Sequence, residues 1–179
     1  RLLQRRHFVA LTECHGSEGD LISCELPAGV TAFFSPGSAH RGGVGILVRS
    51  EWLREFNSAD PEWVVTSPGR IATLRLRGPK GRLDLVVVYF PTGTRVEEVS
   101  GSGALRTLRE DRNMARRALS RGIAPTSRAL SIIMGDFNTV TVEEDRRDVV
   151  HQQENGERDV GEEDHWNSTV ARPHNLYEL

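Results

Sequence analysis

The chain has 179 residues, of which 37% are hydrophobic and 27% charged, a composition typical of one globular domain with a core of its own. Its formal net charge of -2 excludes a strong overall attraction for nucleic acid. No apolar stretch approaches the roughly 20 residues that span a bilayer, and no signal-peptide pattern opens the sequence. We therefore expect a soluble, intracellular domain that is not secreted and has no membrane partner.

The two cysteines, Cys14 and Cys24, are too few for a disulfide framework. They could pair with each other, but free thiols in a reducing compartment are the favoured interpretation. His15 stands beside Cys14, yet these three side chains lack a fourth ligand at the spacing of a zinc site. The sequence therefore favours free thiols over a disulfide or a structural zinc.

Three short apolar runs early in the chain predict buried strands. They are His7–Glu13, Val30–Phe34 and Gly42–Val48. The first run ends in a carboxylate, Glu13, and the second is closed by the turn sequence SPGS. The glycines of the third run suit a strand that other backbone or a ligand approaches closely.

The segment from Arg70 to Phe90 predicts an antiparallel hairpin. Its first half alternates apolar and charged residues, as in Leu74, Arg75 and Leu76, which is the two-residue period of a half-buried strand. The sequence GPKG then turns the chain, and the following strand contains a run of three valines that is apolar on both faces. Such a strand is expected at the centre of a sheet.

The second half of the chain contains the clearest helix signal. Apolar residues fall on one stripe of Gly103–Gly122, and the final glycine suits a C-terminal stop. An apolar strand, Leu130–Met134, follows the helix. After Val142 the sequence is rich in acid and poor in apolar residues, which is typical of loop or disorder. The pattern predicts a mixed α and β domain with a largely antiparallel sheet.

Polar side chains stand where three of the predicted strands end: Glu13, Tyr89, and the pair Asp136 and Asn138. If the sheet brings these ends together, one rim holds two carboxylates, an amide and a phenol. This set suits Mg²⁺ and phosphate, because Mg²⁺ needs only one or two protein carboxylates beside water and substrate oxygens. Asp136 and Asn138 are two residues apart, so in an extended segment both face one side and Phe137 faces the core.

Each of these residues also has a plain structural interpretation. A glutamate at a strand end is often bonded to a nearby turn. A tyrosine such as Tyr89 is often a core aromatic with its hydroxyl at the surface. The sequence GDFN can form an Asx-type turn. The residues taken singly do not decide between these interpretations.

Four different motifs follow one another along the chain, and together they are far more specific than any one of them. They are LTECH (Leu11–His15), RGGVGILV (Arg41–Val48), VVYFP (Val87–Pro91) and MGDFNTV (Met134–Val140). This series resembles the endonuclease/exonuclease/phosphatase superfamily, which has the deoxyribonuclease I-like fold. The sequence GDFNTVTVEEDR is most similar in style to the endonuclease domains of non-LTR retrotransposons.

The resemblance implies an α/β (α+β) fold, namely a four-layer αββα sandwich of two mainly antiparallel sheets, here incomplete. Residues 1–147 would form a partial catalytic domain and residues 148–179 a polar, acidic tail that is loop or poorly ordered. The implied activity is that of a Mg²⁺-dependent phosphodiesterase, with Mn²⁺ as an alternative ion, that nicks DNA. The resemblance also implies a reverse-transcriptase domain in the same polyprotein and a nuclear location.

Carried over to this sequence, the resemblance assigns Glu13 as the metal ligand. Tyr89 would hydrogen-bond to the scissile phosphate or its surroundings. Asp136 would orient the attacking water and help to deprotonate it. Asn138 would hold either the phosphate or that aspartate.

The chain departs from the family pattern in several places. Thr12 stands where the family has Gln, and Thr92 stands where Asn is common. The first strand of the family with its Asn, a late Asp, and the final SDH motif with the catalytic His have no counterpart. We therefore expect a fragment with little turnover alone. A non-catalytic remnant, and a phosphatase or sphingomyelinase-like member of the same superfamily, are the alternatives.

Overall fold

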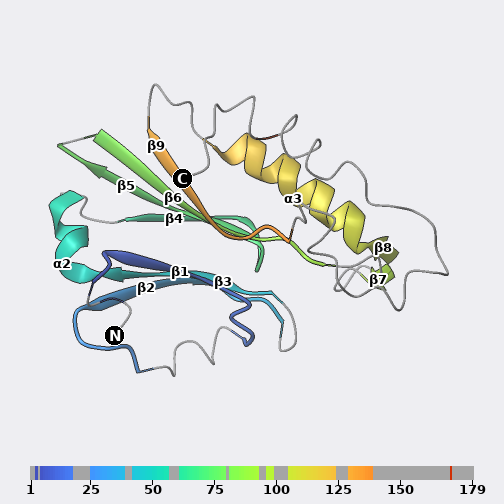
Figure 1. Ribbon diagram of the computed structural model, residues 1–179, viewed down its shortest axis with the longest axis horizontal. Coiled ribbons are helices and arrows are strands. Elements are labelled where there is room, and N and C mark those ends of the chain that lie inside the picture. The colour runs from blue at the N-terminus through green and yellow to red at the C-terminus, as the bar shows by residue number, and fades with distance from the viewer. Residues whose placement is uncertain are drawn as a thin grey trace, which may run out of the picture.

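The computed structural model describes residues 3, 5–17, 25–38, 42–56, 61–79, 81–92, 96–98, 105–123, 129–138 and 170. These residues form two sheets that lie face to face, a small two-stranded sheet and one long helix (Figure 1). The predicted tail, residues 148–179, lies outside the described residues except for Val170. Its predicted lack of order therefore stays a prediction, as does the boundary near residue 147.

The first sheet contains three antiparallel strands in the order β1-β3-β2. The strands are β1 (Phe8–Thr12), β2 (Val30–Ser35) and β3 (Val44–Arg49). They confirm the three strands that the early apolar runs predict, with small shifts at their ends. The central strand β3 is the most deeply buried, as expected for a strand with neighbours on both sides.

The second sheet has the order β4-β5-β6-β9. Its strands are β4 (Glu62–Ser67), β5 (Ile71–Gly78), β6 (Gly81–Tyr89) and β9 (Leu130–Asp136). Strands β5 and β6 confirm the predicted hairpin. Strand β9 runs parallel to β6, so the C-terminal ends of both strands lie side by side at one end of the sheet. Strand β4 was not predicted, because this edge strand exposes Val65 and Thr66 and shows no regular apolar pattern.

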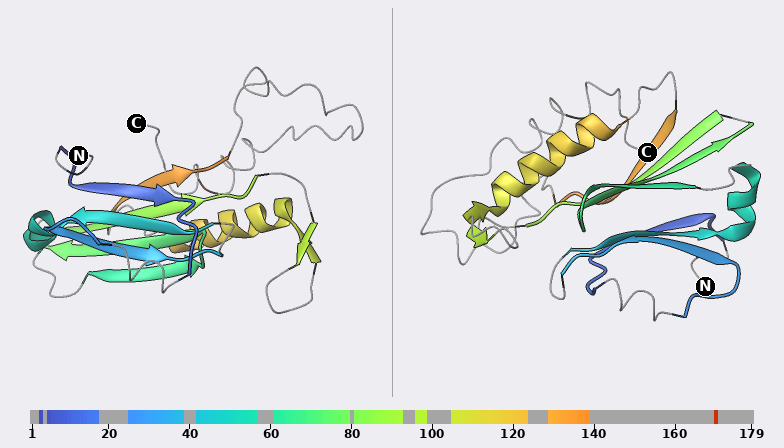
Figure 2. Two further views of the ribbon diagram at one scale, coloured as in Figure 1. Left: turned by 90° about the horizontal axis from the view of Figure 1, so that it is seen from below. Right: turned by 180° about the vertical axis from the view of Figure 1, so that it is seen from behind.

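The two sheets pack through their inner faces and enclose the main core (Figure 2). The buried residues of this core come from β3, β5 and β6: Val44, Ile46, Val48, Ala72, Leu74, Leu76, Leu85, Val87 and Tyr89. At one end of the sandwich, Trp52 of α2 (Ser50–Leu53) stacks on His7 and packs edge-on against Phe56 of η2 (Arg54–Phe56). Neither short helix was predicted.

The long helix α3 (Leu108–Gly122) covers the outer face of the second sheet (Figure 1). The predicted end at Gly122 is correct, but the predicted start at Gly103 is wrong. Residues Leu105–Thr107 instead form strand β8, which pairs with β7 (Val96–Glu98). The helix begins after Thr107 because the Thr107 side chain and Glu110 form a reciprocal capping box.

The α/β sandwich of two mainly antiparallel sheets is confirmed. Within the described part of the chain, α3 supplies one outer helical layer, and α2 with η2 lies at one end of the sandwich (Figures 1 and 2). Three of the four expected layers are therefore visible. No helix among the described residues is long and apolar enough to cross a membrane.

Candidate active site

Glu13 follows the last residue of β1 and has a left-handed backbone, with φ of 55°. The next amide, that of Cys14, donates to the carbonyl of Gly43 at 3.1 Å. This approach requires a glycine at position 43, because a Cβ there would overlap the Cys14 carbonyl oxygen. The backbone thus turns out of the strand at Glu13, and its exposed side chain reaches across toward the second sheet.

Tyr89 ends β6 and lies in the core between the sheets, with 8% of its surface exposed. Its hydroxyl donates a hydrogen bond of 2.6 Å to Oε1 of Glu13, which is 76 residues away in sequence. Burial, and then this hydrogen bond, raise the pKa of Tyr89 above its ordinary value of 10.0. Tyr89 is therefore a neutral phenol near pH 7 and acts as a hydrogen-bond donor to the carboxylate.

Asp136 ends β9 and is the register partner of Tyr89 in the parallel pair β6–β9. Ile132 and Met134 of the same strand pack against the core between the sheets. Since alternate side chains of a strand share a face, Asp136 faces the same gap as Tyr89. The Asp136 carbonyl accepts the amide of Phe90 at 2.9 Å, which ties the ends of the two strands together.

Asn138 turns away from the strand direction. Its φ is 47°, its amide donates to Oδ1 of Asp136 at 2.9 Å, and its side-chain Nδ2 donates to the carbonyl of Phe90 at 2.6 Å. The segment forms an Asx-type turn at Asp136, which is the plain structural interpretation of GDFN, and not the extended chain on which the expected common direction of Asp136 and Asn138 rests. Phe137 faces the core as predicted and packs edge-on against Phe90.

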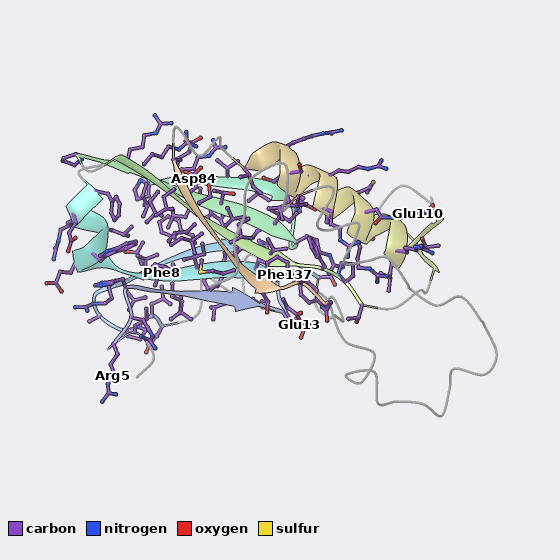
Figure 3. The ribbon with its side chains drawn as sticks, turned by 45° about the horizontal axis from the view of Figure 1, so that its top comes forward. Arg5, Phe8, Glu13, Asp84, Glu110 and Phe137 are labelled. Atoms are coloured by element: carbon purple, nitrogen blue, oxygen red, sulfur yellow. The ribbon has the colours of Figure 1, made fainter. Side chains whose placement is uncertain are left out.

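The structure brings the predicted residues to one end of the sandwich. Glu13 and Tyr89 are in direct contact, Asp136 lies beside Tyr89 across the sheet, and Asn138 bonds to Asp136. Strand β1 also contacts both β6 and β9. In the view of Figure 3, Glu13 and Phe137 lie next to each other. The catalytic and metal-binding roles of these residues stay predictions.

Of the four predicted site residues, Glu13 and Asp136 supply the carboxylates. Among the residues that the structure describes, no group of three or more His, Cys, Asp and Glu side chains could hold a metal ion. Carboxylate oxygens nevertheless suit Mg²⁺, which completes its coordination with water and substrate oxygens. The donor set therefore fits a hard cation. Cys14 is a free thiol whose pKa is raised by burial, so it stays protonated; Cys24 lies outside the described residues.

Arg70 contacts the candidate site but was not predicted from the sequence. It precedes β5, its Cζ lies 5.0 Å from the centroid of the Tyr89 ring, and its carbonyl accepts the Tyr89 amide at 2.8 Å. In the sequence around it, nothing marks Arg70 except that it follows the turn sequence SPG. Because its partner is 19 residues further on, no periodicity could have revealed the stacking.

Comparisons with known proteins found a matching family and a similar solved structure. The family model described as "Endonuclease/Exonuclease/phosphatase family" matches residues 1–176. A solved structure of humanized D. rerio TDP2, carrying 14 mutations, is similar with 14% identity and a TM-score of 0.45, and the match covers 78% of this chain and 56% of that one. The chain thus spans about half the length of that structure. Among curated proteins no relative matches.

The family match extends over nearly the whole sequence and includes all four motifs. This match supports a hydrolase of the phosphodiesterase or nuclease type, and members of the family generally depend on a divalent metal. The chain therefore belongs to the endonuclease/exonuclease/phosphatase family.

Proposed function

We propose that this chain forms the cation- and phosphate-binding part of a Mg²⁺-dependent phosphodiesterase that nicks DNA, of the kind found in non-LTR retroelements. The observation that carries the proposal is the hydrogen bond between Tyr89 and Glu13, with Asp136 beside Tyr89 in register. These residues come from both sheets and meet at one rim. A folded core alone does not require a carboxylate and a phenol to meet there.

Glu13 would hold the cation through its carboxylate, and the Tyr89 hydroxyl would keep that carboxylate in place. A bound Mg²⁺ would offset the charge that develops on the phosphate oxygens. Asp136 would align the attacking water and accept its proton. Arg70 stacks on the ring of Tyr89 and so holds its orientation.

Asn138 would act on Asp136 and not on the phosphate. Its backbone amide donates to the Asp136 carboxylate, and its side-chain amide group is engaged by the Phe90 carbonyl. Of the two roles that the family resemblance implies for this residue, the contacts favour support of the aspartate.

The chain alone would turn over slowly, because it has no counterpart of the SDH motif that supplies the catalytic histidine in the family. We therefore separate cation binding from cleavage in the test. Mg²⁺ or Mn²⁺ titrated into the 179-residue chain should bind, and Glu13→Gln should abolish that binding. Glu55→Gln, which alters an exposed carboxylate of η2 at the other end, is the matched control.

Cleavage is tested on supercoiled plasmid with the protein encoded by the whole reading frame around this chain. Nicking that Asp136→Asn removes would support the proposal. Equal nicking by both proteins would exclude Asp136 from the mechanism. Absence of cation binding in the unmodified chain would favour a non-catalytic remnant.

A further inference from the structure

Two arginines lie on the buried side of α3, where a core helix ordinarily carries leucine or alanine. Only 3% of Arg112 and 1% of Arg116 is exposed. Arginine keeps its charge in proteins, so its burial requires the loss of hydration of a full cation. Packing alone would be served by an apolar side chain of similar size, so the contacts of the two guanidinium groups need a specific explanation.

Both guanidinium groups reach the two residues that follow Tyr89. Nη1 of Arg112 donates to the carbonyl of Pro91 at 3.0 Å, and Cζ of Arg116 lies 5.6 Å from the centroid of the Phe90 ring. Nη1 of Arg116 also lies 3.4 Å from Oδ1 of Asn113, one turn earlier on the helix. Helix α3 therefore contacts Phe90 and Pro91, the segment after β6, from the outer face of the sheet.

Phe90 is the link between this helix and the candidate site. Its amide donates to the Asp136 carbonyl, its carbonyl accepts Nδ2 of Asn138, and its ring packs on the Phe137 ring at a centroid distance of 5.8 Å. All three residues of the turn thus touch Phe90. A displacement of Phe90 must therefore displace the turn that carries Asp136.

We infer that Arg116, assisted by Arg112, is a positioning residue that holds the Asp136–Asn138 turn in place through Phe90 and Pro91. The guanidinium of Arg116 restrains the Phe90 ring by a cation–π contact, and Arg112 fixes the next carbonyl. The inference rests on the proposed function only for its consequence in catalysis. The contact of α3 with the Asp136–Asn138 turn through Phe90 is a property of the fold, so it can be tested without measuring turnover.

The first experiment measures amide hydrogen exchange by NMR in the 179-residue chain. Arg116→Met keeps the bulk of the side chain and removes the cation. We expect the amides of Phe90 and Asn138 to exchange about tenfold faster in this variant, while central amides of the β5–β6 hairpin change little. Arg117→Met, an exposed neighbour on the same helix, is the matched control and should leave all of these rates unchanged.

Arg116→Lys supplies the rescue, because it keeps a cation over the Phe90 ring and should recover most of the protection. Unchanged exchange at Phe90 and Asn138, or faster exchange by the same factor throughout β5 and β6, would overturn the inference. If Arg116→Met does not fold, Arg112→Gln carries the same test through Pro91, with the same two amides as the readout.

A second experiment separates this inference from the proposed function. Arg116→Met leaves Glu13 untouched, so its Mg²⁺ affinity should equal that of the unmodified chain. In the protein from the whole reading frame, the variant should lower kcat for plasmid nicking and leave KM nearly unchanged. A change confined to KM would contradict positioning of the turn. If the unmodified protein binds no cation, the proposed function fails while the exchange result still decides this inference.

Discussion

Replacement of Gly135 by alanine tests whether close contact between β6 and β9 sets the rim of the sandwich. Gly135 has φ of 137°, a conformation that other residues rarely adopt. A Cβ at this position would overlap the carbonyl oxygen of Val88, which is its register partner. The alanine side chain can therefore enter only if the end of β9 moves away from β6, and Asp136 moves with it.

The magnitude follows from a comparison with Gly81, where φ is 116° but a Cβ would meet nothing within 4 Å. Gly81→Ala should therefore lower the free energy of unfolding by about 1–3 kcal/mol, the usual cost of an unfavourable backbone conformation. Gly135→Ala carries the same cost and also weakens strand hydrogen bonds at about 1 kcal/mol each. We expect it to lose about 2 kcal/mol more than the control. The total loss of Gly135→Ala, the cost at Gly81 plus this difference, is a large share of the roughly 5–15 kcal/mol by which a domain is stable.

Urea unfolding, followed by tryptophan fluorescence and by circular dichroism, measures both variants on the same scale. The Mg²⁺ titration described above then shows whether the displaced end of β9 also weakens the site. If Gly135→Ala costs no more than Gly81→Ala, the strands do not approach as described. The placement of Asp136 beside Tyr89 would then be wrong.

Three smaller perturbations test other contacts. Because the pKa of Tyr89 is raised in the fold, its neutral phenol stabilises the protein below its ordinary pKa of about 10, and this contribution is lost as pH rises through the raised value. Urea titrations at increasing pH should thus show a steeper loss of stability for the unmodified chain than for Tyr89→Phe; parallel curves would contradict this. Asn138→Ala should lower the free energy of unfolding by about 1–2 kcal/mol, and Asn138→Gly by less, because alanine also disfavours the positive φ; equal losses in urea would argue against the turn. Thr107→Ala should cost about 1 kcal/mol in thermal melting and Thr107→Ser much less, since serine keeps the cap of α3; equal costs would exclude a role for the hydroxyl.

Elements with a strong periodic signal were predictable from the sequence. The alternation at Leu74–Leu76 and the apolar run before Tyr89 gave the hairpin, because each strand there has a buried face on a defined period. The edge strand β4 was not predictable, since its half-exposed residues carry no such period. The start of α3 was misplaced because apolar residues continue before Thr107, and only the capping box shows where the helix begins.

The positions of Glu13, Tyr89 and Asp136 at the ends of strands were predictable, but several of the contacts between them were not. Glu13 and Tyr89 stand at strand ends in the sequence, whereas their hydrogen bond depends on how two sheets pack. The sequence leaves open whether Asp136 and Asn138 belong to extended chain or to an Asx-type turn, and only the hydrogen bond between them in the structure shows the turn. Arg70 and Phe90 carry no chemical signal of their own, and their importance appears only through tertiary contacts.

Backbone conformation provides independent support for the site. Among the described residues, Glu13 and Asn138 are the two non-glycine residues with positive φ. A left-handed conformation costs an ordinary L residue about 1–2 kcal/mol, although asparagine tolerates it better than glutamate does. At position 13 a glycine would remove this strain, but it would also remove the carboxylate that Tyr89 contacts. Strain at these two positions, both at the rim where β1 and β9 end, is therefore better explained by the need to aim a carboxylate and to support Asp136 than by the stability of the fold.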